Sequence, residues 1–371
     1  ALYRVDVASS EITQLTTRRG SESNPLPSPD GRMIAYLGNE FTTDTYTERE
    51  LSVMRADGSG ARVVARELGG IGNVTWAADG SGLYFNAAMK GTSNLWYVPI
   101  DGAPRAVTQG NHMLSTADIV GGVGVGTRTS YHEPGSLVTF DLDDPGDIRV
   151  LKGTNEAVLS QVELGEVDEI WYESVDGLPI QGWINTPPGF DPSRQYPLIL
   201  RIHGGPHSMY NTGFDFKNQD HAANGFVVLY TNPRGSSGYG SDFGNAINYA
   251  YPSMDYDDLM TGVDSMLERG YIDERNLFVY GGSGGGVLTA WIVGHTDRFT
   301  AAVAKAPVTN WISFVGTTDG SSWYFDFEKH FWEDPSEHLQ RSPIMYVGNV
   351  STPTMVMTGE RDLRTPMEQT E

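Results

Sequence analysis

A repeat in roughly the first 160 residues constrains the fold more than any other feature of the sequence. Segments of apolar and β-branched residues recur at start-to-start spacings of 49, 44 and 42 residues. Asp-Gly pairs lie between them, and such pairs favour hairpins because the turn needs a positive φ. A period in the forties with several short strands per repeat is typical of β-propeller blades. The repeated segments are residues 2–6, 51–54, 95–98 and 137–141.

This repeat predicts a partial β-propeller of about four blades over residues 1–165. A β-sandwich with accidental spacing is the alternative. A closed propeller usually needs more blades than four. We therefore expect the chain to be a piece of a longer protein, with further blades before residue 1.

The pattern changes after residue 165, where apolar strand-like runs alternate with helical segments. Apolar residues at 259, 263, 266 and 267 have helical spacing. Continuous apolar runs without alternation are typical of strands buried on both faces of a parallel sheet. Residues 166–371 are therefore predicted to form an α/β hydrolase domain with a mostly parallel, doubly wound sheet. The expected strands are 196–202, 225–230, 276–280, 301–306 and 354–358, and the expected helices are 256–269 and 287–293.

The segment Gly281-Gly282-Ser283-Gly284-Gly285 matches the pattern G-x-S-x-G and lies between a predicted strand and a predicted helix. A nucleophile elbow occupies this place in α/β hydrolases, and its glycines avoid clashes around a strained serine. The alternative is a glycine-rich phosphate loop, but the lysine of that motif does not follow. The sequence therefore predicts Ser283 as a nucleophile.

A serine nucleophile needs a base, and the base needs a carboxylate to orient it. In α/β hydrolases the chain order is serine, acid, histidine. Asp362 follows the predicted strand 354–358 and is our candidate acid, with Glu360 second; a solvated turn carboxylate is the alternative. All eight histidines precede Asp362, so either the triad has an unusual order or its histidine lies beyond residue 371. We expect the latter, and we expect residues 1–371 alone to be inactive. The histidines are His112, His132, His203, His207, His221, His295, His330 and His338.

An oxyanion hole needs backbone N–H groups directed at the tetrahedral intermediate. Gly284, directly after the nucleophile, is one candidate donor. Gly205, in the loop His203-Gly204-Gly205-Pro206-His207, is the other. The two histidines of this loop cannot share a helix face across Gly-Gly-Pro, so we interpret them as packing residues and not as a metal pair. No metal or organic cofactor is predicted.

An aromatic-rich segment lies between Ser283 and Asp362. Such a segment could line an apolar or proline-accepting substrate pocket. Packing of a cap or of the propeller interface is the alternative, and the sequence does not decide between them. The candidate pocket residues are Trp311, Trp323, Tyr324 and Trp332.

Together these segments resemble the prolyl oligopeptidase family of serine peptidases, in particular its acylaminoacyl-peptidase and dipeptidyl-aminopeptidase-like branch. The matching stretches are 203–206, 232–240, 281–286 and 352–366. The resemblance implies Ser283 as nucleophile, Asp362 as acid, and a histidine some tens of residues past residue 371. It also implies a propeller that caps the active site and admits short or unfolded peptides.

Two departures from the family pattern bear on specificity. An aromatic residue often follows the nucleophile in this family, whereas Gly284 stands here, which is expected to widen the site. No distinctive acidic motif for holding a free peptide N-terminus is present, so release of dipeptides is unsupported. An esterase on the same fold and a non-catalytic, propeller-based binding protein are the two alternative functions.

The formal net charge of −22 argues against a nucleic-acid partner, because phosphate binding needs clustered Lys and Arg. The longest apolar runs have the length of strands, so no membrane partner is expected. Short peptides are the predicted substrates. The absence of cysteine does not discriminate between cytoplasm and periplasm, and a homo-oligomer stays an open alternative.

Overall fold

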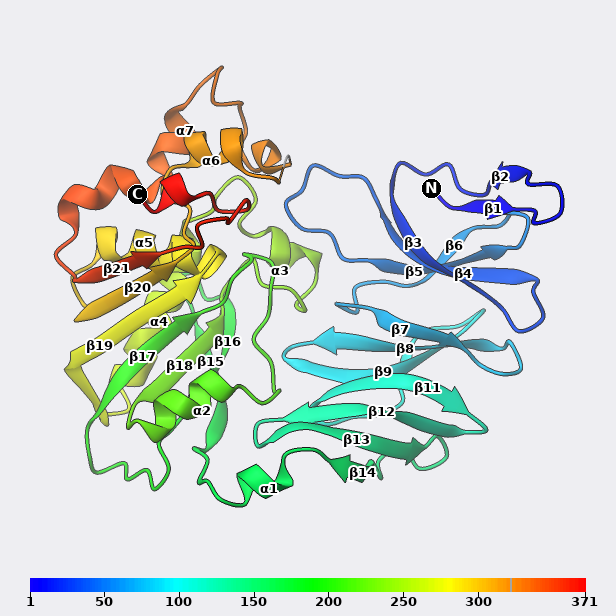
Figure 1. Ribbon diagram of the computed structural model, residues 1–371, viewed down its shortest axis with the longest axis horizontal. Coiled ribbons are helices and arrows are strands. Elements are labelled where there is room, and N and C mark those ends of the chain that lie inside the picture. The colour runs from blue at the N-terminus through cyan, green and yellow to red at the C-terminus, as the bar shows by residue number, and fades with distance from the viewer. Residues whose placement is uncertain (321) are drawn as a thin grey trace.

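The computed structural model describes residues 1–320 and 322–371, and the chain forms two parts of different architecture. The first part is all β and the second is an α/β sheet with helices around it (Figure 1). The predicted fold class, an α/β hydrolase preceded by a partial β-propeller, is confirmed. Among the described residues, no helix combines the length and the hydropathy that crossing a bilayer requires.

The all-β part contains a hairpin and three four-stranded antiparallel units. The repeated sequence segments lie on β1 of the hairpin and on β5, β9 and β13, which are the third strands of the three units. A single parallel bridge between Met113 and Ser93 joins the second and third units. The hairpin is β1 (Tyr3–Val5) and β2 (Ile12–Gln14). The units are β3 (Gly20–Pro27), β4 (Met33–Glu40), β5 (Glu50–Arg55) and β6 (Arg62–Ala65); β7 (Gly72–Trp76), β8 (Gly82–Met89), β9 (Thr92–Pro99) and β10 (Arg105–Ala106); and β11 (Met113–Val120), β12 (Val123–Ser130), β13 (Glu133–Asp141) and β14 (Arg149–Gly153).

The α/β part is built on a seven-stranded sheet in the order β15-β16-β18-β17-β19-β20-β21. The strands from β18 to β21 are parallel, as expected, while β15 and β16 add an antiparallel edge. The strands are β15 (Val167–Glu173), β16 (Pro179–Asn185), β17 (Tyr196–Ile202), β18 (Val227–Asn232), β19 (Ile272–Gly282), β20 (Ala301–Lys305) and β21 (Thr354–Met357).

The helices of this part follow the strands in the order expected of βαβ units. The predicted helices 256–269 and 287–293 correspond to α4 and α5. The α-helices are α2 (Phe216–Ala223), α3 (Ser241–Asn245), α4 (Met254–Leu267), α5 (Gly284–His295), α6 (Trp311–Thr317) and α7 (Ser336–Gln340), and a short α1 (Glu156–Leu159) precedes the sheet. The 3₁₀ helices are η1 (Trp323–Asp326), η2 (Pro343–Asn349) and η3 (Met367–Gln369).

The main hydrophobic core lies between the parallel strands and helices α4 and α5. Leu198, Leu200 and Leu229 on β17 and β18 are fully buried, as are Val263 and Met266 on α4. Burying such side chains provides about 1.5–3 kcal/mol each relative to exposure. Because these strands are parallel, their carboxyl ends lie at the same edge of the sheet, and Ser283 lies at that edge.

Candidate active site

Ser283 joins the last residue of β19 to the first residue of α5. Its backbone has φ 57° and ψ −121°, which is a strained conformation for a residue with a side chain. Its N–H donates a hydrogen bond of 2.9 Å to the carbonyl of Lys305, and its carbonyl accepts one of 2.9 Å from Val287. These bonds hold a sharp strand-to-helix turn with the serine at its apex, as a nucleophile elbow requires.

The glycines around Ser283 are required by close backbone contacts. A Cβ on Gly285 would lie 2.4 Å from the carbonyl oxygen of Ile202. A Cβ on Gly281 would lie 2.4 Å from the oxygen of Gly285, and one on Gly286 would lie 2.4 Å from the oxygen of Lys305. Real Cβ atoms do not approach oxygen this closely, so α5 can start directly against β17 and β20 only with glycine at these positions.

The two candidate oxyanion donors, Gly205 and Gly284, are neighbours beside Ser283. A Cβ on Gly284 would lie 3.0 Å from the backbone nitrogen of Gly205, and one on Gly204 would lie 3.4 Å from the Cβ of Ser283. Gly205 has φ 126°, a backbone conformation that residues with a side chain adopt only with strain. Two chain segments about 80 positions apart in the sequence thus bring Gly205 and Gly284 into close contact beside Ser283.

Asp362 lies in the loop after β21, at the same edge of the sheet as Ser283. The strand β20 separates the two, since Ser283 N–H binds the Lys305 carbonyl and Ala306 N–H binds the Met357 carbonyl at 2.6 Å. Oδ1 of Asp362 accepts hydrogen bonds from the N–H groups of Thr365 at 2.9 Å and Arg364 at 3.0 Å. The bond from Thr365 is the main reason that the pKa of Asp362 lies below its usual range, so the group is a carboxylate at neutral pH.

The structure describes all eight histidines, and none of them hydrogen-bonds to the Ser283 hydroxyl or to Asp362 in the described part of the chain. His203 lies in the loop after β17, two residues before Gly205. Its Nδ1 lies 2.7 Å from the Gly204 carbonyl and its Nε2 lies 3.0 Å from Ser236 Oγ. Burial lowers the pKa of His203 to about 4, so the ring is neutral. Both nitrogens are thus engaged in packing the loop.

A cavity of about 400 Å³ opens at Ser283. Its wall carries Arg201, Lys217 and Lys305 but no carboxylate. Arg201 is held by Asp215 at 2.5 Å and by the Asn218 carbonyl oxygen at 2.7 Å. The wall is therefore positively charged in a chain whose net charge is −22. Within residues 1–320 and 322–371, no three His, Asp or Glu side chains are placed to hold one metal ion.

The aromatic candidates for a substrate pocket do not line this cavity. Trp311 is 1% exposed and packs against Phe314 and Phe327, and its Nε1–H donates a 2.9 Å hydrogen bond to the Arg341 carbonyl. Trp332 is 65% exposed and stacks on His330. Trp323 packs at the edge of the core, and Tyr324 pairs with its neighbour Phe325. Large aromatic faces bury most area against one another, and this favours the packing alternative for Trp311.

The sequence analysis did not identify Tyr251, which is hydrogen-bonded to the turn at Ser283. Its hydroxyl donates a 2.7 Å hydrogen bond to the carbonyl of Gly284, and its own carbonyl accepts one of 2.7 Å from Arg341 Nε. Tyr251 is 5% exposed. It lies in an irregular loop before α4, where no periodic or turn signal marks it.

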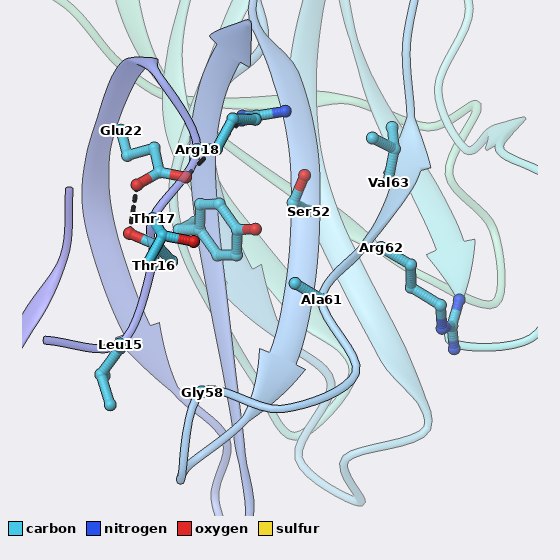
Figure 2. Close-up of a pocket in the computed structure, with 11 residues that line it drawn as sticks. Leu15, Thr16, Thr17, Arg18, Glu22, Ser52, Gly58, Ala61, Arg62 and Val63 are labelled. Atoms are coloured by element: carbon cyan, nitrogen blue, oxygen red, sulfur yellow. Dashed lines mark hydrogen bonds and ion pairs between the residues drawn. The ribbon is translucent and has the colours of Figure 1, made fainter.

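Another cavity, of about 270 Å³, lies between the first four-stranded unit and the segment 15–18 that precedes it, and its wall contains both polar and apolar side chains (Figure 2). Thr16 donates a hydrogen bond to Glu22, and Arg18 lies 3.6 Å from Glu22 and 3.2 Å from Glu50. Arg18 in this cavity is thus paired with two carboxylates. The cavity at Ser283 differs because its wall includes a serine with a strained backbone.

Comparison with known proteins agrees with this geometry. Residues 212–371 match the prolyl oligopeptidase family. The uncharacterized peptidase YuxL of Bacillus subtilis is 36% identical over 301 residues, which are 80% of this chain and 46% of that protein. Dipeptidyl-peptidase 5 of Porphyromonas gingivalis is 30% identical over 358 residues, which are 93% of this chain and 52% of that protein.

Solved structures show the same fold. The acylaminoacyl peptidase of Pyrococcus horikoshii superposes with a TM-score of 0.84 at 22% identity, covering 97% of this chain and 57% of that one. The chain spans about half the length of the curated relatives it matches. The sequence matches, the shared fold and the strand-to-helix turn at Ser283 agree, and the chain belongs to the prolyl oligopeptidase family.

Proposed function

We propose that this chain carries the nucleophile, the acid and the oxyanion donors of a serine peptidase that cleaves short peptides through an acyl-enzyme. One observation carries the proposal: Ser283 occupies a strained strand-to-helix turn beside the amides of Gly205 and Gly284. Strain of this kind costs about 1–3 kcal/mol and persists where it serves a function.

The proposed reaction begins when Ser283 Oγ attacks the carbonyl carbon of a peptide bond and loses its proton to an imidazole base. The carbonyl oxygen becomes an oxyanion that accepts hydrogen bonds from the N–H groups of Gly205 and Gly284. The base then protonates the departing amine, and the C–N bond breaks. Water hydrolyses the resulting ester and restores the Ser283 hydroxyl. The amino end of the twelve-residue helix α5 adds a favourable field for the negative charge.

The base is the part of the triad that these residues do not supply. The rings of His203 and His207 bind neighbouring loops, and the carboxylate of Asp362 accepts backbone N–H groups of its own loop. We therefore propose that the catalytic histidine belongs to a part of the protein outside residues 1–371. Asp362 would orient that histidine from the loop after β21.

Short peptides are the proposed substrate class because the propeller lies beside the catalytic sheet (Figure 1). Bonds between the two parts include Thr212 N–H to the Gly91 carbonyl at 2.8 Å and Lys90 N–H to the Gly238 carbonyl at 3.0 Å. We propose that the propeller limits the size of the substrates that reach Ser283. The relatives' names, dipeptidyl-peptidase and acylamino-acid-releasing enzyme, also denote release of small units from peptides.

The test uses the full-length protein that contains this chain. Peptide p-nitroanilides and the matching p-nitrophenyl esters are compared, and a fluorophosphonate probe reports the reactive serine. We expect peptide turnover, labelling at Ser283, and loss of both in Ser283→Ala; Asp362→Asn should lower kcat by about 10⁴-fold, as expected for a triad acid. Turnover of esters alone would favour an esterase. An unlabelled wild-type protein without turnover would favour a binding role and refute the proposal.

A further inference from the structure

The segment that follows Gly205 and Pro206 contacts all three propeller units. This segment, residues 207–214, is called here the contact segment. From the first unit, Thr45 Oγ1 lies 3.0 Å from His207 Nε2. From the second, Gly91 N–H lies 3.3 Å from Met209 Sδ, and from the third, Thr129 Oγ1 accepts a 3.0 Å hydrogen bond from Phe214 N–H.

His207 is the end of the contact segment nearest the site. Its Nδ1 lies 2.7 Å from the Gly235 carbonyl, and burial holds its pKa below the usual value, so the ring is neutral. A neutral ring with hydrogen on Nδ1 donates to Gly235 and accepts from the hydroxyl of Thr45. The backbone of His207 also lies close to Gly205, since a Cβ on Gly205 would lie 2.5 Å from the His207 nitrogen.

The loop that carries Thr45 is itself anchored to the catalytic part. Tyr46 N–H donates to Asn245 Oδ1 at 2.9 Å, and Asn245 Nδ2 donates to the Tyr46 carbonyl at 2.9 Å. The Tyr46 ring lies 5.0 Å from the His207 ring, centroid to centroid. In Figure 1 the loop between β4 and β5 reaches toward α3, where Asn245 lies. The hydroxyl of Thr45 is therefore held in a defined place against His207.

We propose that Thr45 and His207 are positioning residues, through which the propeller holds the Gly205 N–H at the oxyanion. The inference rests on the proposed function. Electrostatic stabilisation depends on donors held in place before the reaction, and a shift of about 1 Å can cost up to about 100-fold in rate. A hydrogen bond from the propeller to His207, two residues from Gly205, limits such a shift. The propeller is then part of the catalytic apparatus as well as a cover.

The test measures peptide hydrolysis by the full-length protein and its Thr45→Val and Thr45→Ser variants. Valine keeps the shape of threonine but removes the hydroxyl, so we expect kcat to fall about tenfold with KM unchanged, because the oxyanion exists only in the transition state. Serine keeps the hydroxyl and should retain wild-type kcat to within about twofold. His207→Ala should lose at least as much kcat as Thr45→Val.

Thr43→Val is the matched control, because Thr43 is exposed on the same loop. It should keep wild-type kcat, and its thermal midpoint should equal that of Thr45→Val. Wild-type kcat in Thr45→Val, equal losses in the valine and serine variants, or a change in KM alone would each overturn the inference. Ser283→Ala is assayed in parallel: if it stays active, the proposed function fails, whereas an inactive Ser283→Ala beside a fully active Thr45→Val refutes only the positioning role.

Discussion

Arg234 binds both carboxylate oxygens of the fully buried Asp258, with Nε 2.9 Å from Oδ2 and Nη2 2.8 Å from Oδ1. The backbone N–H of Arg234 donates a third bond, of 2.8 Å, to Oδ2. Asp176 adds a second carboxylate 3.0 Å from Nη2. The Asn-Pro-Arg-Gly loop after β18 is thereby fastened to helix α4, which explains its arginine structurally.

Replacing Arg234 by Met should lower the free energy of unfolding by about 3–5 kcal/mol, because it leaves the Asp258 charge buried without its cationic partner. Arg234→Lys should lower the free energy of unfolding by a smaller amount, since an ammonium group cannot bind both carboxylate oxygens of Asp258 in the fork geometry of arginine. Urea unfolding of the full-length protein measures both. Arg275→Met is the control: its side chain is 85% exposed and its pair with Asp273 should contribute no more than about 1 kcal/mol. Equal losses at the two arginines would contradict the assignment.

Two glycine-to-alanine changes should act in opposite directions. Gly285→Ala places a Cβ 2.4 Å from a backbone oxygen of β17 and should cost about 1–3 kcal/mol of stability, with peptide hydrolysis reduced at least about tenfold. Gly316, in α6, has no atom within 4 Å of such a Cβ. Gly316→Ala should stabilise the protein by up to about 1 kcal/mol through helix propensity and leave hydrolysis unchanged. Thermal unfolding and rate assays on both variants check this, and a stable, active Gly285→Ala would disprove the steric account of the elbow.

Stability should depend on pH through Asp255. Burial raises the pKa of this carboxyl group to about 7, and the hydrogen bond from the Ser253 N–H lowers that pKa by a smaller amount. In the unfolded chain this carboxyl titrates near 3.8, so between about pH 4 and 7 the folded state binds the extra proton. Stability from this group is therefore present below pH 4 and is lost, at up to about 1.4 kcal/mol per pH unit, as pH rises to 7.

Asp255→Asn should remove that slope. The difference in unfolding free energy between variant and wild type, measured by urea titration at several pH values, should grow in the variant's favour from pH 4 to 7 and stay constant above. A difference independent of pH over this window would mean that Asp255 is ionised in the folded protein.

Local patterns account for most of the fold. The continuous apolar run of β17 was predicted with its observed bounds, because a strand buried on both faces leaves a signal within its own residues. The propeller repeat was found because each unit must bury the same strand in the same way. The antiparallel pairing of β15 and β16 was not predicted, since pairing partners depend on contacts between distant residues.

In the candidate site, too, local features could be predicted from the sequence, whereas features that depend on contacts between distant residues could not. The elbow is local: a strand, five residues and a helix within one stretch of chain, so Ser283 and its glycines could be identified from their order alone. The aromatic segment could not be interpreted from its order, because composition does not tell a pocket wall from the core that Trp311 enters.

The sequence by itself therefore identified the candidates for nucleophile, acid and oxyanion donors, because those expectations rest on residue type and local spacing. Only the tertiary structure decided that Gly205 adjoins Gly284, that Tyr251 supports the elbow, and that the contact segment meets all three propeller units. These relationships join residues that are tens to more than a hundred positions apart, and packing free energy, not local propensity, selects them.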